Sequence, residues 1–145
     1  MIYPDAFLEF CSTTSHKLTS LRKHILYILW SANKPLKAYE ILDQLLQTMS
    51  NAKPPTVYRV LDYFVVNGLV HKIESIQSYT LCQEPDKQYA SEILMVCDSC
   101  HGVLEVYDET LHGLLKRLST NRQFALGADT IELKGICHLC QSQAP

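Results

Sequence analysis

The feature that most constrains how this chain can fold is a pair of CxxC motifs far apart in the sequence. Cys97 and Cys100 form "CDSC", Cys137 and Cys140 form "CHLC", and 36 residues lie between the two motifs. In each motif, two intervening residues let both sulfurs turn toward one point, and two such motifs supply the tetrahedral thiolate shell that zinc prefers. We therefore predict a zinc site that fixes two distant segments of the chain to one ion.

Two disulfides or a redox-active CxxC are the alternatives to zinc for these cysteines. A reducing cytosol disfavours stable disulfides, and a redox motif does not need a second copy. In a four-thiolate shell every position is filled by sulfur, so no position remains open for a substrate or a water molecule. The zinc is therefore predicted to be structural, stabilising a small domain, and not catalytic.

Composition favours a folded protein without a membrane anchor. The chain has 145 residues, of which 47% are hydrophobic, and its longest unbroken apolar run, Ile25–Trp30, is far shorter than the roughly 20 residues that span a bilayer. The N-terminal segment "MIYPDAFLEF" has acidic residues where a signal peptide would have basic ones. We expect a cytoplasmic protein with no membrane partner.

The first half of the sequence predicts helices followed by a β-hairpin. Apolar residues at helical spacing follow a possible Thr19 cap, recur over Ala38–Met49, and recur again over Pro55–Val66, which Asn67-Gly68 ends. Leu69–Cys82 then has the pattern of two short strands around a polar turn. This order is that of a winged helix-turn-helix, which we assign to residues 1–82.

The second half predicts a small α/β domain over residues 89–145, so that the whole chain is α+β. Ser91–Cys97 and Gly102–Asp108 have strand patterns, four leucines between 111 and 118 indicate a helix, and Phe124–Cys137 suggests extended structure. The polar segment 83–88, "QEPDKQ", is the predicted hinge. The charge also changes between the halves, with 8 Lys and Arg against 6 Asp and Glu in residues 1–80, and 5 against 9 in residues 81–145.

The motifs described above resemble those of the ferric uptake regulator (Fur) superfamily, and within it those of the zinc uptake regulators. The resemblance is specific in Ala52–Ser75, "AKPPTVYRVLDYFVVNGLVHKIES", in the following "SYTLC", and in the spacing of the four CxxC cysteines. "LTSLRKHIL" is similar to the family's helix after "LTPQR", with Ser20 where proline is common. The similarity extends from about residue 11 to residue 140.

The resemblance implies a homodimeric, metal-dependent repressor whose second half dimerises and whose second zinc site regulates DNA binding. His71, Cys82 and Glu105 match three of the four ligands of that regulatory site. The family places the fourth ligand, a histidine, before the first CxxC, but here that segment contains no histidine and Ala90 falls at the position. Either water completes the site, or Glu84, Asp86 or Glu92 substitutes, or the sensor is weakened.

The third predicted helix leaves Thr56, Tyr58 and Arg59 outside its apolar stripe. In a winged helix the N-terminal part of this helix enters the major groove of double-stranded operator DNA, where Arg59 would contact guanine and the other two a base edge or a phosphate. Four further residues are candidates for phosphate contacts that position the protein: Tyr39, Lys53, Arg22 and Lys37. The alternative is that Tyr58 and Arg59 only solvate a helix face.

Two other classes of function are alternatives to a zinc-responsive repressor. The first is a Fur-like DNA-binding or interaction protein with only structural zinc and a degenerate sensor site. The second is an enzyme. The sequence has no Ser/His/Asp arrangement, no phosphate-binding Gly-rich loop and no HExxH motif, so we expect no catalytic activity and no small-molecule substrate beyond the metal ion.

Overall fold

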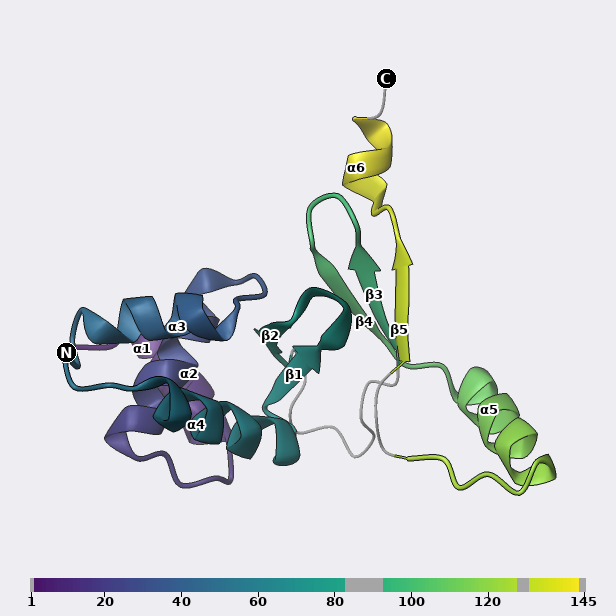
Figure 1. Ribbon diagram of the computed structural model, residues 1–145, viewed down its shortest axis with the longest axis horizontal. Coiled ribbons are helices and arrows are strands. Elements are labelled where there is room, and N and C mark those ends of the chain that lie inside the picture. Colours follow the sequence, from purple (N-terminus) through teal and green to yellow (C-terminus); the bar gives the residue numbers. More distant parts are fainter. Residues whose placement is uncertain (1, 83–92, 128–130, 144–145) are drawn as a thin grey trace. The chain divides into compact units, whose positions relative to one another are not determined.

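The computed structural model describes residues 2–82, 93–127 and 131–143, and it separates into two compact units, Met1–Gln88 and Tyr89–Pro145 (Figure 1). Helices dominate the first unit and a three-stranded sheet organises the second, so the predicted α+β class is confirmed. The predicted hinge at residues 83–88 lies outside the described residues.

Residues 2–82 of the first unit form four α-helices and a two-stranded hairpin whose turn contains a short 3-10 helix, Glu74–Ile76, in the order expected of a winged helix. Its elements are α1 (Asp5–Thr13), α2 (Ser20–Ala32), α3 (Ala38–Leu46), α4 (Pro54–Val66), β1 (Val70–Ile73) and β2 (Ser78–Leu81). β1 and β2 are antiparallel, with Val70 opposite Leu81. Leu36 and Tyr79 exchange two backbone hydrogen bonds of 2.9 and 2.8 Å, which attach the hairpin to the segment between α2 and α3.

Local sequence signals explain where these helices begin and end. The Thr19 hydroxyl accepts a hydrogen bond from the Arg22 N–H at 3.3 Å, which caps α2 as predicted. α4 begins with Pro54 and Pro55, where missing N–H groups cost least. Gly68 follows α4 with φ +75°, a conformation that glycine adopts without strain, and the chain turns there into β1.

The core of the first unit lies where α2, α3 and α4 meet. The predicted apolar stripe of α4 is largely buried, since Val57, Val60, Leu61 and Phe64 are each at most 7% exposed. These side chains pack with buried residues of the neighbouring helices, among them Ile25, Leu29, Ile41 and Leu45. The opposite face of α4 is thereby fixed as the one that points to solvent.

The second unit is a small sheet with two helices. Its elements are β3 (Ile93–Cys97), β4 (Val103–Val106), α5 (Glu109–Asn121), β5 (Ile131–Gly135) and α6 (His138–Ser142). The strand order is β4-β3-β5, with β3 antiparallel to β4 and parallel to β5. Of the segment predicted to be extended over Phe124–Cys137, the described residues form a strand at Ile131–Gly135, and the short helix α6 was not predicted.

No helix in the described ranges is long and apolar enough to cross a membrane. The longest, α2, α4 and α5, have 13 residues each, whereas about 20 are needed to span a bilayer.

Candidate functional site

The four CxxC cysteines converge at one end of the second unit's sheet. Parallel pairing places Cys97 opposite Gly135, so the chain leaves β5 beside the turn that carries Cys100. The four sulfur atoms all lie within 4.8 Å of one another, and Cys100 Sγ is 3.8 Å from Cys137 Sγ. Zn–S bonds of about 2.3 Å in a tetrahedron imply sulfur separations of roughly 3.8 Å. The donor set and its spacing therefore fit a four-thiolate zinc ion.

Backbone groups around the cluster donate to the sulfurs. The Cys137 N–H lies 3.3 Å from Cys97 Sγ, and the Gly102 N–H lies 3.3 Å from Cys100 Sγ. Hydrogen bonds of this kind orient metal ligands and stabilise their negative charge. His101, between Cys100 and Gly102, adopts the left-handed conformation with φ 61°, which turns the chain so that the Gly102 N–H reaches the sulfur.

The hydrogen bonds separate the acidities of the thiols. The backbone N–H of Cys137, followed by that of Cys100, lowers the pKa of Cys97 to about 6. A side-chain hydrogen bond with Cys137 raises the pKa of Cys140 to about 12. Without metal the cluster therefore holds a thiolate at Cys97 beside a protonated Cys140. Zinc must displace the remaining protons, which makes its affinity dependent on pH.

The geometry does not support the disulfide alternative. All six cysteines lie in described parts of the chain and are free thiols. The separation of 3.8 Å between Cys100 Sγ and Cys137 Sγ is nearly twice the ~2.05 Å of an S–S bond.

Two of the predicted regulatory ligands lie on the β1–β2 hairpin. His71 is opposite Thr80, and the Cys82 N–H donates to the Leu69 carbonyl at 2.9 Å, which continues the ladder beyond β2. Side chains alternate between the faces of a strand, so this register puts His71 and Cys82 on the same face as diagonal neighbours. Cys82 is buried, at 7% exposure.

The other predicted regulatory ligand belongs to the second unit. Glu105 lies on β4 opposite Leu94 of β3. Together His71, Cys82 and Glu105 offer an imidazole nitrogen, a sulfur and a carboxylate oxygen as ligand atoms. Ala90, and the possible substitutes Glu84, Asp86 and Glu92, lie outside the described residues.

The predicted DNA-contacting residues are accessible on the first unit. Tyr58 and Tyr39 are 50% and 63% exposed, and Arg59 also points to solvent from α4. Thr56 is half-buried in the first turn of α4, and Lys53 is exposed at its N-cap. All of these residues belong to the two helices of the helix-turn-helix or to the cap of the second.

Sequence reasoning missed one backbone donor to the cysteine cluster and one contact between two helices of the first unit. Gly102 supplies a backbone donor to the zinc cluster, and only its position directly after "CDSCH" hinted at that role. Tyr63 stacks with Arg22, whose guanidinium carbon lies 3.7 Å from the centre of the tyrosine ring. No local pattern predicted this contact, because the two residues belong to different helices.

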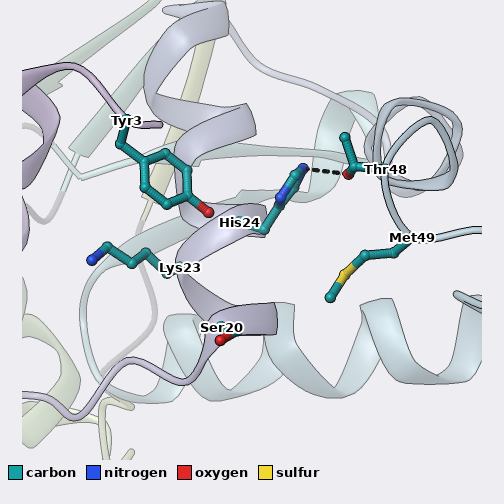
Figure 2. A pocket seen from close by; sticks show the side chains of 6 residues that line it. All are labelled: Tyr3, Ser20, Lys23, His24, Thr48 and Met49. Atoms are coloured by element: carbon teal, nitrogen blue, oxygen red, sulfur yellow. Dashed lines mark hydrogen bonds between the residues drawn. The ribbon is translucent and has the colours of Figure 1, made fainter. Parts of the chain in front are cut away.

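A cavity of about 410 Å³ lies beside α2, lined by Tyr3, Ser20, Lys23, His24, Thr48 and Met49 (Figure 2). His24 is buried, and its Nε2 lies 3.0 Å from Thr48 Oγ1, which links α2 to the segment after α3. Thr48 Oγ1 also lies 3.3 Å from the Leu45 carbonyl oxygen, so the hydroxyl bridges the imidazole and the last turn of α3. Burial lowers the pKa of His24. This arrangement is structural.

Comparison with known proteins gives consistent matches along the chain. The sequence profile of the Ferric uptake regulator family matches residues 13–134. The zinc uptake regulation protein of Escherichia coli (strain K12) is 35% identical over 132 residues, covering 91% of this chain and 77% of that protein. The zinc uptake regulation protein of Mycobacterium tuberculosis (strain ATCC 25618 / H37Rv) is 28% identical over 134 residues, covering 90% and 99%.

Solved structures agree with these sequence matches. A zinc uptake regulator complexed with zinc and DNA superposes with a TM-score of 0.84 at 33% identity, covering 96% of this chain and 93% of that one. Holo XcZur superposes with a TM-score of 0.82 at 33% identity, covering 96% and 99%.

Proposed function

The chain belongs to the ferric uptake regulator family of metal-responsive transcription regulators, which are not enzymes, and from this premise we propose that it is a zinc-responsive repressor that binds operator DNA as a homodimer in the cytoplasm. The observation that carries the proposal is a second group of side chains that zinc commonly binds. This group consists of His71, Cys82 and Glu105, shares no residue with the four-cysteine cluster, and has His71 and Cys82 on one face of the hairpin.

The second set of ligands is the proposed zinc sensor. A thiolate at Cys82 and an imidazole at His71 suit zinc better than iron or manganese. Glu105 comes from the other unit, so an ion bound by all three side chains would restrain the two units relative to each other. Couplings between a metal site and a binding surface are typically about 1–3 kcal/mol, a range of about fivefold to 150-fold in affinity.

The exposed face of α4 is the proposed DNA-reading surface. Arg59 is an exposed side chain in the N-terminal half of the helix, and a bidentate contact from arginine to guanine contributes ~1–3 kcal/mol of discrimination. Thr56 and Tyr58 precede it in the first part of the helix, while Tyr39 and Lys53 would contact the phosphate backbone.

Unsatisfied apolar surface in the second unit supports the homodimer. No residue of α5 is buried, and Leu114 and Leu118 are 46% and 51% exposed. On the sheet, Met95 pairs with Leu104 and with Leu133, which makes an exposed apolar row across all three strands. This row lines a groove of about 640 Å³ next to the cysteine cluster. Soluble monomers rarely leave surface of this kind uncovered.

A second candidate function is a DNA-binding or interaction protein of the same family with structural zinc only. The sequence observation that favours it is the missing histidine at the Ala90 position. In the zinc-responsive case, water or one of Glu84, Asp86 and Glu92 completes the sensor shell. The two functions differ in whether DNA binding follows the free zinc concentration.

DNA binding of the full chain at buffered free zinc tests the proposal. The probe is a duplex selected from a random library by the zinc-loaded chain, and fluorescence anisotropy gives the affinity. We expect Arg59→Ala to lose at least about tenfold in affinity at saturating zinc, because a base contact is removed in each half-site. His71→Ala should instead raise the zinc concentration at half-maximal binding, whereas Lys72→Ala, on the other face of β1, should not.

Selective binding that is independent of free zinc would favour the structural-zinc alternative. Unchanged selectivity in Arg59→Ala would contradict the role given to that residue. An unchanged zinc midpoint in His71→Ala would remove His71 from the sensor.

A further inference from the structure

Arg22 was a candidate phosphate contact, but its guanidinium lies against a tyrosine of α4. Its guanidinium carbon is 3.7 Å from the centre of the Tyr63 ring, and both residues are half-buried. The Arg22 Nη1 donates to the Lys17 carbonyl at 3.4 Å, and the Arg22 backbone N–H donates to Thr19 Oγ1 at 3.3 Å. His16 adds an edge-on contact to the same ring, at 6.3 Å between centroids and 82° between planes. Arg22 is therefore fixed in its position over the ring.

Tyr63 is also a possible partner for Arg59 on the same helix. The two residues are four positions apart in α4, a spacing that makes side chains neighbours on one helix face. The side chain of Tyr63 leans toward the helix N-terminus, and thus toward Arg59. Arginine stacks readily on aromatic rings. In this structure, however, Arg22 is the cation over Tyr63, and Arg59 is exposed.

We infer that Arg22 is a positioning residue for DNA reading: by occupying the face of Tyr63, it prevents Arg59 from stacking back onto its own helix and keeps that side chain available for a base. The inference rests on the proposed DNA-binding function and adds a residue to it. The like charge of Arg22 acts in the same direction, because it disfavours a second guanidinium beside the first. Arg22 would then affect selectivity without itself contacting DNA.

A rescue experiment distinguishes this role from a phosphate contact. The variants are Arg22→Gln, Tyr63→Leu and the pair together, in the zinc-loaded full chain. Affinity is measured for the selected duplex and for a random duplex of equal length, over a series of salt concentrations. Lys23→Gln is the matched control, because it removes the neighbouring positive charge of α2, which faces Tyr3 at 5.5 Å from the ring centre. Thermal unfolding confirms that each variant is folded.

We expect Arg22→Gln to lower affinity for the selected duplex about threefold to tenfold, the range that one competing cation–π contact produces. Affinity for the random duplex and the salt dependence should stay the same. Adding Tyr63→Leu should restore selectivity, because Arg59 then has no ring to stack on. Tyr63→Leu alone and Lys23→Gln should stay within about twofold of the wild type.

Other results would overturn the inference. If Arg22→Gln weakens binding to both duplexes, reduces the salt slope by about one and is not rescued, Arg22 contacts a phosphate. Unchanged selectivity in Arg22→Gln would also exclude the positioning role. If the wild type is selective in the same experiment, the proposed function would still stand. If the wild-type chain prefers no duplex, the proposed function fails, and this inference fails with it.

Discussion

Gly102 donates its backbone N–H to Cys100 Sγ, and a Cβ built at residue 102 would lie 3.2 Å from that sulfur. A zinc ion bound by the four thiolates would hold this sulfur in place, so an alanine here would have to displace the ligand or the turn. We expect Gly102→Ala to weaken zinc about tenfold to a hundredfold, as changes next to metal ligands commonly do. Competition with a chromophoric chelator measures the change.

Gly113→Ala is the control for that experiment. A Cβ at Gly113, which is exposed in α5, meets nothing within 4 Å. Alanine is the better helix former by about 0.5–1 kcal/mol, so this variant should be slightly more stable and should release zinc like the wild type. Equal zinc affinity in both variants would show that the space beside Cys100 does not matter.

The buried imidazole of His24 makes stability depend on pH. Burial lowers its pKa in the folded state below the ordinary value of 6.5, so the unfolded chain binds more protons between these two values. The stabilising effect of the neutral imidazole is therefore present above about pH 6.5 and is lost as the pH falls below it. We expect the melting temperature to drop less between pH 7.5 and pH 5.5 in His24→Gln than in the wild type, measured by calorimetry. An equal drop would contradict this assignment.

Single residues were predictable where chemistry depends on spacing, and not where it depends on three-dimensional proximity. The four cysteines were identifiable because CxxC fixes two sulfurs locally and a closed zinc shell needs two such motifs. The roles of Gly102 and Arg22 were not, since each depends on an atom that only the folded chain brings near. Arg22 in particular has the charge of a phosphate contact, and only the structure reveals its stacking on Tyr63.

At the scale of elements, α5 has a leucine face that the described residues leave partly exposed. Leu118 is 51% exposed on that face, whereas Thr120 is exposed on the opposite side of the helix. We expect Leu118→Glu to raise the dimer dissociation constant at least about a hundredfold, because an unpaired carboxylate would have to be buried at the dimer contact. Thr120→Glu adds the same charge and should leave the dimer intact.

Light scattering after size exclusion gives the mass of each variant over a range of concentrations. If Leu118→Glu dimerises as tightly as the wild type, α5 is not part of the dimer contact. If Thr120→Glu also dissociates, added charge and not burial is the cause.

Elements with their own start and stop signals were predicted closely, and others were not. The Thr19 cap and the Pro54-Pro55 pair locate the starts of α2 and α4 because they act within one turn. β5 at Ile131–Gly135 pairs with β3, and this pairing is a long-range contact that the local pattern does not contain. The helix α6 begins at the second CxxC, where Cys137 is its N-cap.

For the whole molecule, the number of zinc ions per chain separates the proposed functions. We expect native mass spectrometry to find two zinc ions per chain at high free zinc and one at low free zinc. The retained ion belongs to the four thiolates, because structural zinc sites of that type contribute on the order of 10 kcal/mol of binding energy. His71→Ala should take up the second ion only at a higher free zinc concentration than the wild type. A wild-type chain with one ion throughout would contradict a regulatory site.

The division into a helical half and a sheet-containing half was visible from the sequence, because hydrophobic periodicity and charge both change near its middle. The zinc sensor was not derivable in the same way. Its three proposed ligands are separated by other elements, and the hairpin register that aligns His71 with Cys82 is a property of the fold. Resemblance to a family supplied what periodicity and spacing did not.

The parallel pairing of β3 with β5 also means that the two cysteine pairs of the zinc site are synthesised at different times. Cys97 and Cys100 leave the ribosome before Cys137, which follows Cys100 by 37 residues, a delay of roughly two to seven seconds at usual elongation rates. During that interval the nascent chain has half a coordination shell and a sheet that lacks one edge strand. The zinc site of the second half can therefore be completed only after the later cysteine pair is translated, and until then the first pair must stay reduced.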